Sequence, residues 1–220
     1  TPFAGQCTVL TGLQRQSNSD QQFLNQQQRR KQLVFAEQVV MPSNSVERAN
    51  LVRILADLAR RSPDWEVLIK PRIAPGESTF HSTTNHISAT LQQTLGHPPD
   101  NLRLDYRPLP ELLRQSRLMA TVSSTAFFDA LDFGCRPIVM ADFGINPTNG
   151  SHVFAGSGVW QCLDDVEDLD ALDSSLPAPD PDWLAWMGYG TDLAPEKLIK
   201  ALRQLQSDPI ERPPTKPGYL

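Results

Sequence analysis

Residues 118–141 read LMATVSSTAFFDALDFGCRPIVMA, and this stretch decides the fold class. An apolar run of strand length comes first, at 118–122, and a second run follows at 137–141. The residues between them predict a short helix over 126–133 that Gly134 ends. Two buried strands joined by a helix predict a βαβ unit, in which the strands are parallel.

The same alternation of strand and helix continues outward from this unit. The pattern predicts further strands at 33–40, 65–69 and 101–106, with helices at 44–62, 87–95, 110–117 and 195–205. Strands that are apolar almost throughout are typical of parallel sheets with both faces covered, and right-handed crossovers make such sheets doubly wound. We therefore expect an α/β fold with a doubly wound (Rossmann-like) parallel sheet.

Residues 1–32 and 33–220 differ in character. The first segment predicts a short strand at 7–12 and then a polar linker, since eight glutamines lie between residues 14 and 32. A lone strand must pair with something, so the start of the chain is expected to belong to a sheet only partly present here. Residues 33–220 form the predicted domain, with a surface excursion at 164–182 that carries eight acidic residues and no basic one.

Composition excludes several classes of protein. The 220 residues carry a net charge of −5, which gives no general attraction to nucleic acid. Three scattered cysteines argue for a reducing compartment, and we expect a cytoplasmic location. No apolar run reaches the roughly 20 residues of a membrane span, so membrane contact, if any, is expected to be peripheral. No zinc-type His/Cys spacing, Walker loop or G-x-G-x-x-G motif occurs, so we expect no metal and no cofactor.

The candidate site lies where the strands end, because ligands of open parallel sheets bind beyond the carboxyl ends of the strands. Ser123, Ser124 and Thr125 stand at the turn from strand to helix, where free backbone N–H groups and hydroxyls suit a phosphate. Asp129 lies one turn into that helix, at a distance that suits the hydroxyls of a ribose. The alternative is equally simple: Ser and Thr are common helix caps, and Asp129 is then only solvated.

Other strand ends supply further candidates. Lys70 and Arg72 follow the second strand and are cations for a phosphate or a substrate carboxylate, or else an ordinary surface pair. Glu37 and Gln38 follow the first strand. The loop 143–158 is long enough to fold over a ligand, or to be a flexible connection without function, and its polar side chains include Asn149 and His152.

Two of these motifs resemble a known enzyme class. Residues 123–139, SSTAFFDALDFGCRPIV, resemble the signature of the nucleotide-binding half of GT-B glycosyltransferases, with Asp129 where Glu is commoner. Residues 68–72, LIKPR, resemble the Lys-Pro-His-Pro element of bacterial sialyltransferases and capsule Kdo transferases, with Arg72 in place of histidine. Those families also use a double-serine motif to hold a CMP-sugar, and Ser123 and Ser124 form such a pair.

The resemblance implies a donor-binding, C-terminal half of a GT-B enzyme that transfers a sugar from a nucleotide-sugar, with a CMP-sugar favoured, to a glycan or a lipid-linked acceptor. In this picture Ser123, Ser124 and Thr125 bind phosphate, Asp129 binds ribose, and Lys70 and Arg72 bind phosphate or the donor carboxylate, while Glu37, Gln38, Asn149 and His152 lie near the sugar. Residues 8–12 resemble the crossing strand from an acceptor-binding N-terminal domain absent from this chain, which begins at Thr1. We name no general base, and we expect the isolated chain to be inactive.

Two alternatives stay open. A nucleotide-sugar epimerase on the same scaffold breaks the same bond and needs no acceptor. A non-catalytic module that binds nucleotide or a partner protein agrees with the short chain and with the lack of an obvious acid/base pair.

Overall fold

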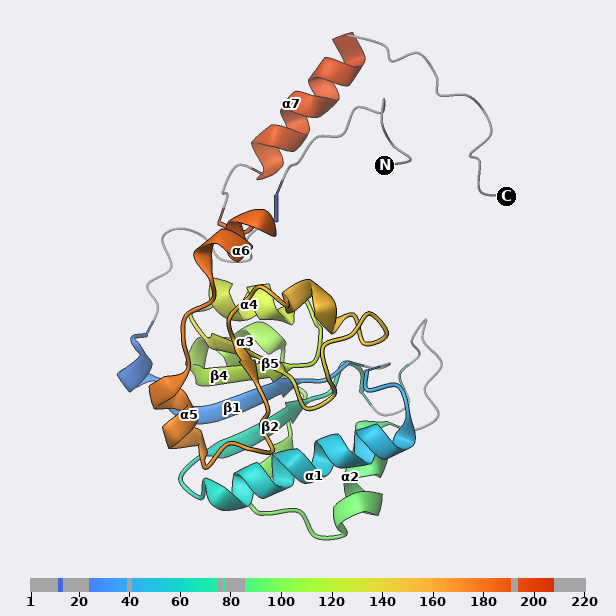
Figure 1. Ribbon diagram of the computed structural model, residues 1–220, viewed down its shortest axis with the longest axis vertical. Helices are drawn as coiled ribbons and strands as arrows, with labels where there is room; N and C mark the ends of the chain where they lie inside the picture. The colour runs from blue at the N-terminus through green and yellow to red at the C-terminus, as the bar shows by residue number, and fades with distance from the viewer. Residues whose placement is uncertain are drawn as a thin grey trace, which may run out of the picture. The chain divides into compact units, whose positions relative to one another are not determined.

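Six parallel strands form a sheet with the order β3-β2-β1-β4-β5-β6 in the computed structural model (Figure 1). The structure describes residues 12–13, 24–38, 41–74, 77, 86–190 and 194–207. The strands are β1 (Arg30–Ala36), β2 (Glu66–Lys70), β3 (Leu102–Leu104), β4 (Ser116–Thr121), β5 (Arg136–Met140) and β6 (Trp160–Gln161). The prediction of an α/β fold with a parallel sheet is confirmed.

Helices connect β1 to β5 in succession and further helices follow β6, most of them within a residue or two of the predicted bounds. They are α1 (Ser45–Arg61), α2 (Ile87–Leu95), α3 (Leu109–Gln115), α4 (Ala126–Asp132), α5 (Leu169–Ser175), α6 (Pro181–Trp186) and α7 (Ala194–Ser207), with short 3-10 turns η1 (Gln26–Gln28) and η2 (Ser151–Phe154). Asn44 caps α1, since its side chain accepts a hydrogen bond from the N–H of Glu47 at 2.8 Å.

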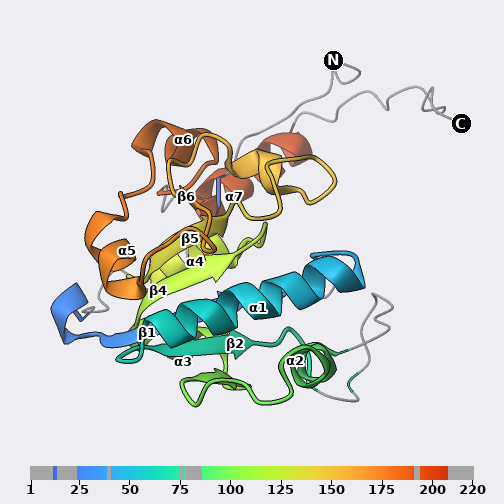
Figure 2. The same ribbon diagram turned by 60° about the horizontal axis from the view of Figure 1, so that its bottom comes forward.

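Both faces of the sheet are covered by helices, as a doubly wound sheet requires (Figures 1 and 2). Side chains alternate along β1, so Leu33 and Phe35 face one apolar core while Val34 and Ala36 face the other. The first core is completed by α1, α2 and α5, and the second by α3 and α4. This alternation explains why the strands are apolar almost throughout.

β1 begins earlier than expected, at Arg30, and so takes in the end of the glutamine-rich segment. The cause is the preceding Arg29, which is buried and donates to the carbonyl oxygens of Leu113 at 2.8 Å, Ser116 at 3.0 Å and Phe133 at 2.7 Å. The chain entering β1 is therefore held in the fold by side-chain bonds that its polar sequence does not suggest.

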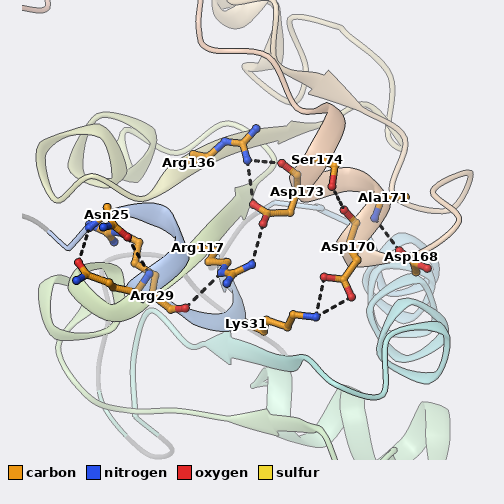
Figure 3. Close-up of polar contacts among 11 residues, drawn as sticks. Asn25, Arg29, Lys31, Arg117, Arg136, Asp168, Asp170, Ala171, Asp173 and Ser174 are labelled. Atoms are coloured by element: carbon orange, nitrogen blue, oxygen red, sulfur yellow. Dashed lines mark hydrogen bonds and ion pairs between the residues drawn. The ribbon is translucent and has the colours of Figure 1, made fainter.

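The acidic segment 164–182 is more than a surface excursion, because its apolar residues Leu169, Leu172 and Leu176 are buried in the first core. Its carboxylates lie against cations at the amino ends of the strands (Figure 3). Asp173 accepts hydrogen bonds from Arg117 at 3.1 Å and from Arg136 at 2.9 Å. Ion pairing at the sheet edge opposite the candidate site thus accounts for part of the run of acidic residues.

The chain divides into two units, residues 16–180 and residues 1–15 together with 181–220. The first holds the sheet. In the second, the N–H of Leu13 donates to the carbonyl oxygen of Gly188 at 2.9 Å, and α7 exposes Leu198, Ile199 and Leu202. The strand expected at 7–12 lies outside the described residues apart from Gly12. Within the described ranges, no helix combines the length and the apolar character needed to cross a bilayer.

Candidate functional site

Four neighbouring strands bring the sequence-predicted residues to one edge of the sheet. Ala36 pairs with Lys70 across β1 and β2, and Phe35 pairs with Ala120 across β1 and β4, so the carboxyl ends of these strands are level. Adjacent strands lie about 4.8 Å apart, so the turns after β2 and β4 are separated by roughly 10 Å, with the end of β1 between them. This span is short enough for one nucleotide-sized ligand to touch both turns.

Gln38 joins the end of β1 to the turn after β4. Its Oε1 accepts a hydrogen bond from the N–H of Ser123 at 2.9 Å, and its Nε2 donates to Ser123 Oγ at 3.2 Å. The amide of Gln38 is therefore committed to shaping the Ser123 turn, whereas the sequence placed it near a donor sugar.

The backbone of this turn is largely occupied by its own side chains. Ser124 donates its N–H to Thr121 Oγ1 at 3.3 Å, and Ser124 Oγ accepts from the N–H of Ala126 at 3.2 Å. With the N–H of Ser123 bound to Gln38, the free amides expected at 123 and 124 are not free. Ser124 thus bonds to the backbone at the start of α4, although the N-cap residue of that helix is Thr125, whose side chain makes no cap bond.

Thr125 is different. It is exposed, and within the described part of the chain neither its N–H nor its hydroxyl makes a hydrogen bond. The donors this turn offers to a ligand are therefore centred on Thr125.

Asp129 lies in the first turn of α4 and is half-buried. Burial raises the pKa of this carboxyl above its usual value, and the carboxylate of Asp132 raises it further. Its oxygens accept no hydrogen bond from another described residue, so they remain acceptors for a ligand hydroxyl.

Lys70 ends β2 and is partly buried. Burial lowers the pKa of its ammonium group, while the nearby carboxylate of Asp105 partly offsets that effect. The Nζ donates to the carbonyl oxygen of Pro71 at 2.6 Å and forms no ion pair with any described residue. The exposed Arg72 also forms none, in contrast to Arg107 after β3, which is paired with Asp105 at 2.6 Å.

Glu37 is buried and ties the end of β1 to the turn after β2. Its Oε2 accepts from the N–H of Arg72 at 3.0 Å, and its own N–H donates to the carbonyl oxygen of Lys70 at 3.1 Å. Its Oε1 accepts from Arg48 Nη2 at 2.7 Å, an ion pair from α1. Sequence reasoning missed Arg48, although its spacing to Leu51 and Leu55 puts an arginine on the apolar face of α1.

The loop after β5 packs on the Ser123 turn through a glycine. Gly150 has φ +68°, and a Cβ built on it would lie 3.7 Å from Ser123 Oγ. The loop is stabilised by hydrogen bonds between its own residues. The buried Asn149, for example, donates from Nδ2 to the carbonyl oxygen of Phe143 at 3.1 Å. His152, in η2, is exposed. Of the two loop residues among those predicted near the sugar, Asn149 makes its side-chain hydrogen bond within the loop itself.

Nothing in the described ranges suggests a metal centre, since no group of three or more His, Cys, Asp or Glu residues is placed to hold an ion. His86 caps α2 instead: the N–H of Ser88 donates to its Nδ1 at 3.1 Å, and its Nε2 lies 2.9 Å from the carbonyl oxygen of Ile73.

The chain matches one known protein family over most of its length. Residues 4–205 match the sequence model of a family described as “Putative glycosyltransferase (DUF6716)”. A search of curated proteins found no match.

Two solved structures share the fold. One, described as a “putative UDP-N-acetylglucosamine 2-epimerase from Listeria monocytogenes”, has 15% sequence identity and a TM-score of 0.52, over 90% of this chain and 50% of that one. The other, the S. aureus MnaA–UDP co-structure, has 13% identity and a TM-score of 0.52, over 98% of this chain and 58% of that one. The chain thus spans about half the length of the one and somewhat more than half of the other.

Proposed function

Because this chain belongs to the family described as “Putative glycosyltransferase (DUF6716)”, we propose that it binds the nucleotide-sugar donor of a glycosyltransferase. The site is the carboxyl edge of β2, β1 and β4. The reaction class is transfer of a sugar from the nucleotide to an acceptor hydroxyl, with the nucleotide as leaving group.

One observation carries the proposal: Lys70 is a partly buried cation without an ion pair in the described part of the chain, level with the turn that carries Thr125. A buried charge is costly unless something compensates it, and a phosphate between the two turns would do so. Thr125 supplies unused N–H and hydroxyl donors at the other turn, and the exposed Arg72 adds a second cation. Catalysis here is electrostatic, because these groups stabilise the negative charge that develops on the leaving nucleotide.

The ribose is assigned to Asp129, whose carboxylate has no hydrogen-bond partner among the described residues and lies one turn beyond Thr125. The double serine and the Lys70-Pro71 pair favour a CMP-sugar, as in bacterial sialyltransferases and Kdo transferases. In this role Ser123 and Ser124 act mainly by shaping the turn, since their N–H groups are bound to Gln38 and Thr121.

A second domain is proposed to supply the acceptor site and the general base. The solved structures that share the fold are almost twice as long as the matched region. In this arrangement residues 33–220 are the donor-binding domain and residues 1–32 the crossing segment and linker, in a cytoplasmic enzyme that makes polysaccharide.

The test is calorimetric titration of CMP, UDP and GDP into the wild type, Lys70→Gln and the matched control Lys31→Gln. Lys31 pairs with Asp170 at the opposite edge of the sheet, so its loss leaves the site intact. We expect Lys70→Gln to weaken binding of the preferred nucleotide by about tenfold and Lys31→Gln to leave it unchanged. Equal affinities for all three proteins would contradict the phosphate assignment.

Incubating the purified protein with a nucleotide-sugar, with and without an acceptor, distinguishes a transferase from the two alternatives. An epimerase converts or releases the nucleotide-sugar without acceptor, whereas a transferase does so only as slow hydrolysis. A binding module does neither, even when an acceptor domain is supplied.

A further inference from the structure

The strongest unexplained feature of the molecule is a buried ion pair beneath the candidate site. Arg48 and Glu37 lie 2.7 Å apart, and their side chains are only 10% and 4% exposed. Arg48 occupies the face of α1 that otherwise carries Leu51, Val52 and Leu55, all fully buried. A well-packed apolar pair at such a place is often as stable as a buried ion pair, so stability alone is a weak reason for these charges.

The pair contacts the turn after β2 directly and is linked to the turn after β4 through Gln38. Through Glu37 Oε2 it holds the N–H of Arg72 at 3.0 Å, which fixes the turn that carries Lys70. Through Arg48 Nη1 it reaches the carbonyl oxygen of Gln38 at 3.4 Å, and the side chain of Gln38 in turn holds Ser123. Arg48 thus bonds to two consecutive residues, Glu37 and Gln38. Glu37 bonds to the turn after β2, and Gln38 bonds to the turn after β4.

The pair also sets the charge of the site. Glu37 is close enough to Lys70 to act on its ammonium group. Without Arg48 its carboxylate would oppose the binding of an anion there. Because the charge of Arg48 offsets that of Glu37, the positive charges of Lys70 and Arg72 are not cancelled locally and can attract an anionic ligand.

We propose that Arg48 is a positioning residue for the donor phosphate: through Glu37 and Gln38 it holds the turn bearing Lys70 and Arg72 in register with the turn bearing Ser123 and Thr125. Arg48 itself does not touch the donor. This inference rests on the proposed function of the same site.

The test compares a nucleotide with its nucleoside, because their affinity ratio isolates the contribution of the phosphate. CMP, UDP and GDP and their nucleosides are titrated into the wild type, Arg48→Lys, Arg48→Met and the double variant Glu37→Met/Arg48→Met. The double variant keeps the net charge and replaces the pair by apolar side chains. Arg60→Met is the control, since Arg60 pairs with Asp57 on the same helix at the exposed surface.

We expect the nucleotide-to-nucleoside ratio to fall about tenfold in Arg48→Met and in the double variant, and by less in Arg48→Lys, which keeps the charge but cannot hold Glu37 and Gln38 together. Arg60→Met should keep the wild-type ratio. A role in folding alone would lower the melting temperature and leave the ratio unchanged in the protein that remains folded.

The outcomes separate the two proposals. A wild type that binds no nucleotide better than its nucleoside contradicts the proposed function, and this inference with it. A wild type that does discriminate, with an unchanged ratio in Arg48→Lys and in the double variant, overturns the positioning role alone. If Arg48→Met does not fold, these two variants decide the question.

Discussion

Gln38 and Ser123, 85 residues apart in the chain, are joined by two hydrogen bonds from one amide: Oε1 accepts from the N–H of Ser123 at 2.9 Å, and Nε2 donates to its Oγ at 3.2 Å. The side-chain amide supplies both contacts at once, with Oε1 as the acceptor and Nε2 as the donor. The shape of the turn after β4 therefore depends on a residue that follows β1.

Replacing Gln38 should loosen the candidate site. Gln38→Leu removes both contacts, and we expect the free energy of unfolding to fall by about 1–3 kcal/mol, since the N–H of Ser123 loses its partner. Nucleotide affinity should fall by about tenfold in calorimetry. The stability and the nucleotide affinity of Gln38→Glu, whose side chain can accept but not donate, should lie between those of the wild type and Gln38→Leu. Gln92→Leu is the control, since among the described residues the side chain of Gln92 bonds only to the carbonyl oxygen of Gly96, at the exposed end of α2; an equal effect there would contradict the assignment.

Arg29 should be among the most sensitive positions for stability. Its buried guanidinium donates to four carbonyl oxygens of described residues, three of them more than 80 residues away, and burial lowers its pKa. Arg29→Met leaves these oxygens unpaired, so we expect a loss of about 3–5 kcal/mol in urea denaturation. The neighbouring Arg30 is exposed, and Arg30→Met should change stability by less than about 0.5 kcal/mol. Similar losses in both variants would show that the carbonyl contacts are not the cause.

Asp129 should trade stability for ligand binding. Burial raises the pKa of this carboxyl in the folded protein, so the unfolded chain ionises first as the pH rises, and the group then disfavours the folded state. Asp129→Asn should therefore be more stable than the wild type at pH 7, and this advantage should shrink as the pH falls through the ordinary range of aspartate.

The binding half of this prediction uses the sugar of the nucleotide. Asp129→Asn should lose affinity for a ribonucleotide but not for its 2′,3′-dideoxy analogue in calorimetry. Equal losses for both ligands would remove Asp129 from the ribose.

The two cysteines that the structure describes should differ in reactivity. Cys135 is buried beside the Arg29 guanidinium, and burial raises the pKa of its thiol to about 12. Cys162 is exposed. The partial loss of solvent around its sulfur has the largest effect and raises the pKa of its thiol, and the carboxylates of Asp142, Asp165 and Asp164 raise that pKa further. Since the thiolate is the reactive form, iodoacetamide should label Cys162 in the native protein, faster as the pH rises, and Cys135 only after unfolding. Peptide mapping by mass spectrometry distinguishes the two sites, and native labelling of Cys135 would contradict the burial argument.

Local patterns were sufficient for most of the architecture. The helix predicted at 87–95 is α2 with the same bounds, and the apolar runs around residues 33, 66, 118 and 137 all became parallel strands. Both successes rest on periodicity and on chain breaks, which act within a few residues. The choice of the carboxyl edge of the sheet as the candidate site followed from the fold class alone.

Segments held by distant partners could not be predicted in this way. β1 starts at Arg30 because Arg29 is held by carbonyls more than 80 residues away. In the same way, α5 forms within the acidic segment because its leucines reach the core and Asp173 meets Arg117 and Arg136. Neither cause is visible in the local sequence.

The amino-acid sequence by itself determined the parallel α/β fold and the set of polar residues that end its strands. Tertiary structure decided which contacts those residues make: Gln38 and Ser124 bond within the protein and Glu37 pairs with Arg48. Among the described residues, Lys70 bonds only to a backbone carbonyl oxygen and has no ion pair, and Thr125 has no side-chain cap bond. The physical reason is that hydropathy and backbone preference are local, whereas hydrogen bonds and ion pairs join residues that only the folded chain brings together.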